Sequence, residues 1–295
     1  MQTQRRTFTL ADGRNIEYLT AGSDDGLPLV VHEGTPGGLV LNASLGKAAA
    51  ERGLRVVQAA RPGYEDSTPR PGRLVADVVA DTAELLDALG AGSYVSIGFS
   101  GGGPHSLAGA ALAGGRCLGA ASVAGVAPYR AEGLDWLAGM GPENVEEFGC
   151  AAKGADALAA YLDKAAAALA GITGEQVAAS LGGLISAADA AVLTGEVADD
   201  LAKGLRGALR NGIAGWRDDD LAFVGDWGFD PAAAGQRAAV WQGDQDNMVP
   251  LAHGQWLAAR IPGARVHLEP GAGHLTMTLS VIDTILDDLL DLAGR

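Results

Sequence analysis

Cysteine is nearly absent from this chain of 295 residues, which contains only Cys117 and Cys150. Two isolated cysteines exclude a disulfide-stapled scaffold and have no metal-ligand spacing, so we expect free thiols in a reducing compartment. Aromatic residues are also few, at 5%, whereas hydrophobic residues reach 48% and glycine occurs 44 times. A core of this composition must rely on close contacts between small side chains.

Basic residues are scarce as well, because 21 Lys and Arg stand against 36 Asp and Glu, for a net charge of −15. Nucleic acids and anionic membranes bind clusters of Lys and Arg, so we expect neither as a partner. No apolar run typical of an export signal follows Arg5 and Arg6, and no stretch is apolar enough to span a membrane. We therefore expect a cytoplasmic protein that acts on a small molecule. Its oligomeric state stays open.

Apolar runs typical of strands alternate with helical segments through the first 128 residues. A turn at 11–14 predicts a hairpin within 7–22. Further strands are expected at 27–31, 55–60, 94–99 and 120–127, with an amphipathic helix at 74–89. Such alternation predicts an α/β fold with a mostly parallel sheet and helices on both faces.

The alternation stops between residues 129 and 226, where only helical segments are visible. Thr173-x-x-Gln176 and Ser186-x-x-Asp189 have the form of capping boxes, with Asp in place of Glu in the second. Strand and helix patterns then resume, with strands expected at 238–243 and 264–268 and helices at 251–260 and 276–292. We therefore predict a core of residues 1–128 and 227–295, with residues 129–226 inserted as a helical cap.

The strongest motif is Gly98-x-Ser100-x-Gly102, between the strand at 94–99 and a following helix. This pattern is typical of a nucleophile elbow, in which a serine hydroxyl is exposed on a sharp strand-to-helix turn. Glycines on both sides let the strand and helix backbones approach closely. We therefore predict Ser100 as a nucleophile.

A serine nucleophile needs a base and a group that orients the base. His274 stands in a glycine loop after the last expected strand, and Asp244 and Asp246 follow the strand before it. The order serine, aspartate, histidine is the one expected on this fold. His105, His253 and His267 are interpreted as packing or surface residues.

A tetrahedral intermediate also needs backbone N–H donors for its oxyanion. Gly101 supplies one, because it directly follows the nucleophile. The other must come from the loop after the strand at 27–31, where Pro36 has no N–H, so Thr35 is favoured and Gly34 is the alternative.

Taken together, these motifs resemble those of the α/β-hydrolase superfamily over essentially the whole length. The resemblance rests on the elbow, on Gly243-x-x-Asp246-x-x-x-Pro250 and on Gly273-His274. It implies that Asp246, rather than Asp244, is the acid of a Ser100–His274–Asp246 triad. His32-Glu33-Gly34-Thr35-Pro36-Gly37 resembles the oxyanion loop, with Glu33 as a departure.

The resemblance implies a serine hydrolase that forms an acyl-enzyme, without metal or cofactor, and a carboxylic ester hydrolase is our leading hypothesis. A proline-iminopeptidase-like aminopeptidase is the alternative, since a carboxylate of the acidic cap could hold a free amine. A non-catalytic protein that uses the fold as a ligand pocket is the rival from another class. We further predict substrate contacts from residues near the oxyanion loop and the two ends of the cap: His32, Trp136, Met140 and Trp216.

Overall fold

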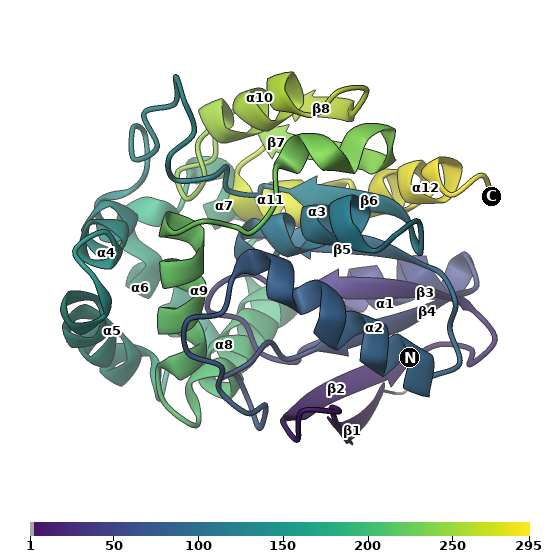
Figure 1. Cartoon of the computed structure of the whole chain (residues 1–295). Helices are drawn as coiled ribbons and strands as arrows, with labels where there is room; N and C mark the ends of the chain where they lie inside the picture. Colours follow the sequence, from purple (N-terminus) through teal and green to yellow (C-terminus); the bar gives the residue numbers. More distant parts are fainter. Residues whose placement is uncertain (1–2) are drawn as a thin grey trace.

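The computed structural model describes residues 3–295. Its eight strands form one sheet with the order β1-β2-β4-β3-β5-β6-β7-β8 (Figure 1). β2 pairs antiparallel with β1 and β4, and every other pair of neighbours is parallel. The strands are β1 (Thr3–Thr9), β2 (Asn15–Ala21), β3 (Leu27–His32), β4 (Leu54–Ala59), β5 (Tyr94–Phe99), β6 (Cys117–Val123), β7 (Ala238–Gly243) and β8 (Arg265–Glu269). The predicted α/β class with a mostly parallel sheet is confirmed.

Helices cover both faces of this sheet. On one face lie α1 (Ala43–Glu51) and α12 (Ile282–Leu292), and on the other α2 (Val78–Ala88), α3 (Gly103–Leu112) and α10 (Leu251–Arg260). Because β3 and β5 are covered on both sides, their residues are buried almost throughout, which explains their continuous apolar sequences. Short 3₁₀ turns complete the chain at Val75–Asp77, Ser100–Gly102, Gly182–Leu184 and Pro231–Arg237.

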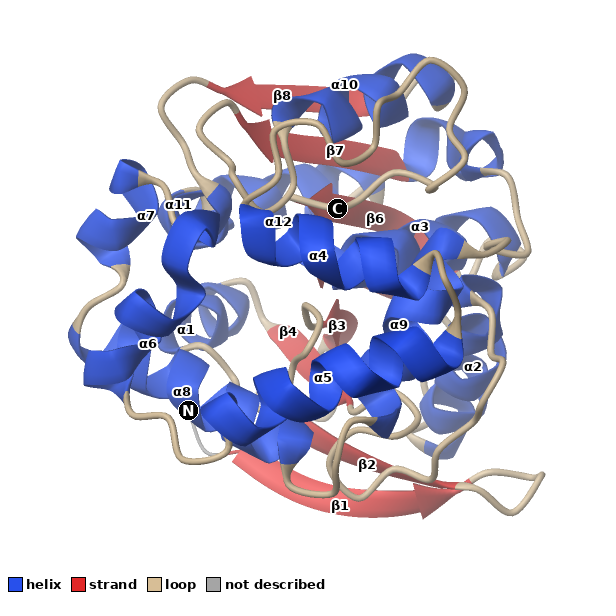
Figure 2. Ribbon diagram, turned by 90° about the vertical axis from the view of Figure 1, so that its left-hand side faces the viewer, coloured by secondary structure: helices blue, strands red, loops and turns tan. Residues whose placement is uncertain are grey.

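Six helices stand between β6 and β7 and are called the inserted helices below. They are α4 (Pro142–Ala151), α5 (Ala155–Leu169), α6 (Gly174–Leu181), α7 (Ala187–Val192), α8 (Gly195–Leu209) and α9 (Ala214–Val224). In Figure 2 they face the viewer, in front of β3 and β4. Leu158 and Leu162 of α5 are fully buried in the main core.

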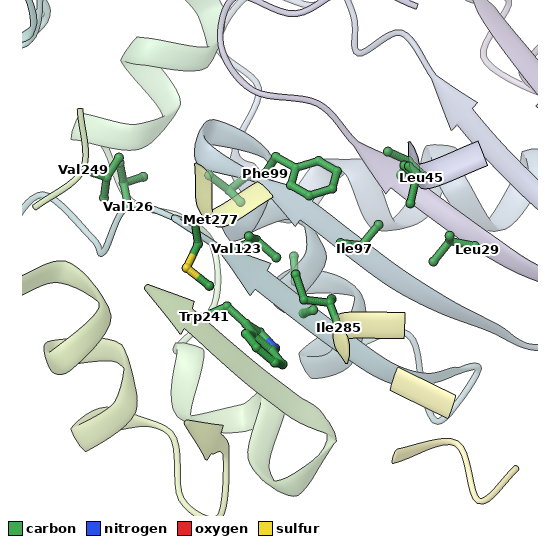
Figure 3. Packing of buried hydrophobic residues seen from close by; sticks show 14 of the residues in the cluster. Leu29, Leu45, Ile97, Phe99, Val123, Val126, Trp241, Val249, Met277 and Ile285 are labelled. Carbon is green, nitrogen blue, oxygen red and sulfur yellow. The ribbon is translucent and has the colours of Figure 1, made fainter. Parts of the chain in front are cut away.

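Trp241, the largest of the fully buried side chains, packs with residues of the sheet and of α12. Trp241 of β7, Ile97 of β5 and Ile285 of α12 belong to one continuous cluster (Figure 3). The cluster also contains Met277 of α11 (His274–Ser280) and Val249 from the loop after β7. The segments that follow β7 and β8 at the carboxyl ends of these strands are thus anchored in the same core.

The structure corrects two local predictions. The helix expected at 276–292 is two helices, α11 and α12, because Val281 between them has φ −121° and ψ 15°. The capping box of Thr173 and Gln176 is confirmed at α6. At α7 only half of the box forms: the Ser186 hydroxyl accepts from the Asp189 amide, but the Asp189 carboxylate is directed to another helix.

Candidate active site

Ser100 stands at the turn between β5 and α3 with a φ of +53°, a conformation that non-glycine residues rarely adopt. The flanking glycines make this turn possible. A Cβ on Gly98 would lie 2.1 Å from the Gly102 carbonyl oxygen, and one on Gly102 would lie 2.0 Å from that of His32. The predicted elbow is therefore built as its sequence indicates, with the strained serine at its tip.

Asp246 and His274 meet at the ends of β7 and β8. The Asp246 Oδ2 lies 2.8 Å from His274 Nδ1, and both side chains are buried. The amides of Met248 and Val249 each donate to Asp246 Oδ1 at 2.8 Å, so these hydrogen bonds hold the carboxylate in position beside the imidazole. A hydrogen bond from Nδ1 to a carboxylate leaves Nε2 as the free acceptor of a neutral imidazole.

Burial alone would lower the pKa of His274, but the Asp246 and Asp189 carboxylates more than offset it and hold this pKa above its usual value. Asp244 has a different environment: it is exposed, and its Oδ1 accepts from the Gly271 amide at 2.7 Å. The structure therefore brings Asp246, and not Asp244, to the histidine.

The loop after β3 lies directly against the elbow. A Cβ on Gly34 would be 3.4 Å from that of Ser100, and one on Gly101 would be 2.4 Å from Thr35 Oγ1. Within residues 3–295, the Thr35 amide N–H donates no hydrogen bond. Gly101 lies in the first turn before α3, where amides have no intrahelical partner. Two N–H groups from separate segments are thus available beside Ser100.

A fully buried carboxylate, Asp219 of α9, holds this loop in place. It accepts a hydrogen bond from Thr35 Oγ1 at 2.8 Å and from the Tyr64 hydroxyl at 2.9 Å. Arg61 and Arg73 each approach it to 2.6 Å. Although burial alone would raise it, the two guanidinium groups hold the pKa of Asp219 well below its usual value. Asp219 therefore remains charged and fixed.

Arg61 extends this network to the backbone of the loop. Its Nη1 donates to the Glu33 carbonyl oxygen at 2.6 Å, and its Nη2 donates to that of Gly34 at 2.8 Å. This network is not visible in the sequence, because Arg61 and Asp219, which anchor it, lie 158 positions apart. One of the inserted helices therefore determines where the loop beside Ser100 lies.

Ser100 and His274 line a single cavity of about 490 Å³. Gly34, Thr35 and Gly101 also line it, together with residues of α4, α5, α6, α8 and α9. Much of the wall is aliphatic, with Leu169, Leu181, Leu184, Val197, Leu201 and Leu205 from the segment between β6 and β7 and Leu275, Leu279 and Ile282 from α11 and α12. Ser100 makes no hydrogen bond to His274 in the structure, but catalytic hydrogen bonds often shorten only with substrate in place.

Of the four predicted substrate contacts, only Trp216 lines the cavity. Trp136 is buried instead against Phe148 and His253, and its Nε1 donates to the Ala127 carbonyl oxygen. Met140 is likewise part of the core. These expectations were wrong because the aromatic residues at the start of the inserted segment attach it to the core.

His32 is the third predicted contact that does not reach the cavity. It is 6% exposed and faces His105, and burial together with that neighbour lowers its pKa well below the usual value. Glu33, which departs from the motif, does line the cavity. Its carboxylate accepts from Gln58 Nε2 at 3.0 Å, and burial raises its pKa to about 7.

A second acidic group at the cavity was not among the residues predicted from the sequence, which pointed only to an acidic cap. Glu147 of α4 lines the wall, and its Oε1 accepts from Trp216 Nε1 at 2.7 Å. Behind it, Asp220 of α9 is fully buried, and neither of its oxygens has a hydrogen-bond partner within the described chain. Burial raises the pKa of Glu147 to about 7 and that of Asp220 well above its usual value, and the nearby Glu147 carboxylate raises the pKa of Asp220 further.

Two further features of the described chain concern metal binding and membrane insertion. Among residues 3–295, no group of three or more His, Cys, Asp and Glu side chains is arranged to hold a metal ion. Over the same range, none of the helices has the length and apolarity needed to cross a membrane.

The solved structures with the same architecture include several enzymes. A hydrolase from Pseudomonas aeruginosa PA01 is 21% identical, with a TM-score of 0.68 and coverage of 99% of this chain and 98% of that one. An enol-lactonase from Burkholderia xenovorans LB400 is 18% identical, with a TM-score of 0.67 and coverage of 98% and 100%. A thermophilic esterase from Thermogutta terrifontis is 19% identical, with a TM-score of 0.65 and coverage of 99% and 100%.

At these identities the solved structures establish the fold alone. No curated protein matches the sequence of this chain. A family model described as alpha/beta hydrolase fold matches residues 28–279, which include Ser100, Asp246 and His274. This chain therefore belongs to the alpha/beta hydrolase fold family.

Proposed function

We propose that the protein is a serine hydrolase that cleaves carboxylic esters of small molecules through an acyl-enzyme. The observation that supports this most directly is the pairing of Asp246 with His274 at 2.8 Å, because His274 lines the same cavity as the strained Ser100. A buried carboxylate, an oriented imidazole and an exposed hydroxyl are the parts needed for nucleophilic catalysis at a carbonyl carbon.

In the proposed reaction, His274 Nε2 takes the Ser100 proton as Oγ bonds to the ester carbonyl carbon. The amides of Thr35 and Gly101 bind the oxyanion of the tetrahedral intermediate. His274 then gives its proton to the leaving alkoxide, which departs as an alcohol and leaves an acyl-enzyme. Water, deprotonated by the same imidazole, attacks the acyl carbon; His274 then returns the proton to Ser100 Oγ as the carboxylic acid is released and the free serine is regenerated.

The shape of the cavity indicates the substrate. Its volume of about 490 Å³ and its aliphatic wall fit an apolar acyl group several carbons long.

The test is covalent labelling of Ser100 by a fluorophosphonate, beside a panel of p-nitrophenyl esters of increasing acyl length. We expect stoichiometric labelling of the wild type, none of the Ser100→Ala variant, and the highest kcat/KM for acyl groups longer than acetyl. A wild-type protein that binds esters but is neither labelled nor active would instead be a non-catalytic binding protein.

The carboxyl pair of Glu147 and Asp220 favours a second function, that of an aminopeptidase. A substrate ammonium at Glu147, which lines the cavity, would bring a positive charge and hydrogen-bond donors to a pair in which neither Asp220 oxygen has a partner among the described residues. A hydrogen bond between charged groups contributes more than a neutral one, so the pair could select substrates with a free amine.

Replacing Glu147 decides between the two substrate classes. If amines bind there, Glu147→Gln lowers kcat/KM for aminoacyl nitroanilides by about tenfold or more and leaves neutral esters unaffected. Glu146→Gln is the matched control, because Glu146 is the exposed neighbour on the same helix. A wild-type enzyme without activity on aminoacyl substrates would eliminate the aminopeptidase function.

A further inference from the structure

Asp189 of α7 is fully buried and forms hydrogen bonds to the beginning of α11, the helix that carries His274. Its oxygens accept from the amides of His274, Leu275 and Thr276 at 2.9, 2.8 and 2.9 Å. The hydroxyls of Thr276 and Ser186 add contacts at 3.1 and 3.0 Å. Three backbone amides and two hydroxyl groups thus donate hydrogen bonds to the two oxygens of this carboxylate.

The Asp189 carboxylate provides hydrogen-bond acceptors for the first backbone amides of α11. The first amides of a helix have no intrahelical acceptor and are usually bonded by a residue just before the helix. Gly273, at that position, has no side chain, and the acceptor comes from 85 positions earlier in the chain. A Cβ on Gly273 would lie 2.3 Å from Ser186 Oγ and 2.5 Å from the Asp189 oxygens, so only glycine admits the carboxylate.

His274 is therefore held from two sides by different parts of the fold. Asp246, in the loop after β7, orients its ring, whereas Asp189 fixes its backbone amide. Met277, three residues later, packs in the core cluster with Trp241 (Figure 3). The freedom that remains to the imidazole is small as long as α7 stays in place.

We propose that Asp189 is a positioning residue for His274, through which the inserted helices set the geometry and charge environment of the general base. The inference rests on the proposed function of His274. It goes beyond that function by making catalysis depend on a residue that does not line the cavity, in a segment usually considered for substrate selection.

Two effects follow from this placement. Loss of the carboxylate would free the start of α11 and misalign Nε2, and a displacement of about 1 Å can cost about 100-fold in rate. It would also remove one of the two charged groups that act on His274, the other being Asp246, so the pKa of His274 would fall.

Asp189→Asn tests both effects, because it preserves the volume but removes the charge and places an amide donor against backbone donors. We expect kcat/KM for an ester to fall about 10- to 100-fold, mainly through kcat. The acid limb of the kcat/KM profile should move to lower pH, and Ser100 should still be labelled by the fluorophosphonate, only more slowly. Glu175→Gln, which removes an exposed carboxylate from the first turn of α6, should change none of these.

A folded Asp189→Asn variant with wild-type kcat and an unmoved acid limb would overturn the inference, even if its melting temperature fell. Should that variant not fold, Thr276→Val decides, because it removes only the contact of the Thr276 hydroxyl with Asp189. It should lower kcat about two- to tenfold at unchanged KM, and wild-type kcat would again overturn the inference. Failure of the proposed function is separate, since the wild type itself would then not be labelled.

Discussion

Ser100→Ala should abolish ester hydrolysis, with a fall in kcat of roughly 10⁶-fold, and leave the fold intact. The substitution removes the oxygen that would attack the carbonyl carbon and very little volume. Ser100 is only half-buried, and its environment is determined by Gly98, Gly102 and the loop at Gly34 rather than by its hydroxyl. The measurement is kcat on the best ester of the panel, with the circular dichroism spectrum as the control for folding.

His274→Ala should cost nearly as much, and the double variant should be little worse than either single one. Residues that act as a unit are not additive, because the remaining member cannot work without its partner. If the two losses instead multiplied, Ser100 and His274 would act in separate steps. A Ser100→Ala variant that kept more than about a thousandth of wild-type kcat would transfer the nucleophile to another residue.

The sequence was sufficient for features that depend on neighbouring residues. Strand and helix order follow from apolar periodicity, and the elbow requires glycines two positions on each side of Ser100, where a Cβ would collide with backbone. Asp246 could be distinguished from Asp244 only through the family resemblance. The structure supplies the physical reason, since only Asp246 has its carboxylate turned inward to His274.

What sequence reasoning missed are contacts between distant segments. Asp219 meets Thr35 across 184 positions, and Asp189 meets His274 across 85. Both are aspartates within helical patterns, where an acidic residue usually faces solvent. Trp136 and Met140 were misplaced for the opposite reason, because an apolar residue has the same sequence signature on a cavity wall as in a packed core.

Asp246→Asn should lower kcat roughly 10⁴-fold without loss of fold. The carboxylate accepts from His274 Nδ1 and from the amides of Met248 and Val249. An asparagine oxygen can keep the two amides, but its nitrogen then faces Nδ1 as a donor. The neutral imidazole would therefore carry its proton on Nε2, and this nitrogen could no longer take the proton of Ser100.

Asp244→Asn is the matched control for this prediction, because it makes the same chemical change two residues away. Asp244 is exposed, and an asparagine oxygen can still accept from the Gly271 amide, so kcat should stay within about twofold of wild type. Both variants should be compared on the same ester at a pH where the wild-type rate is flat. If Asp244→Asn were the more damaging of the two, the hydrogen bond between Asp246 and His274 would not be the one used in catalysis, and Asp244 would have to reach the histidine in the working enzyme.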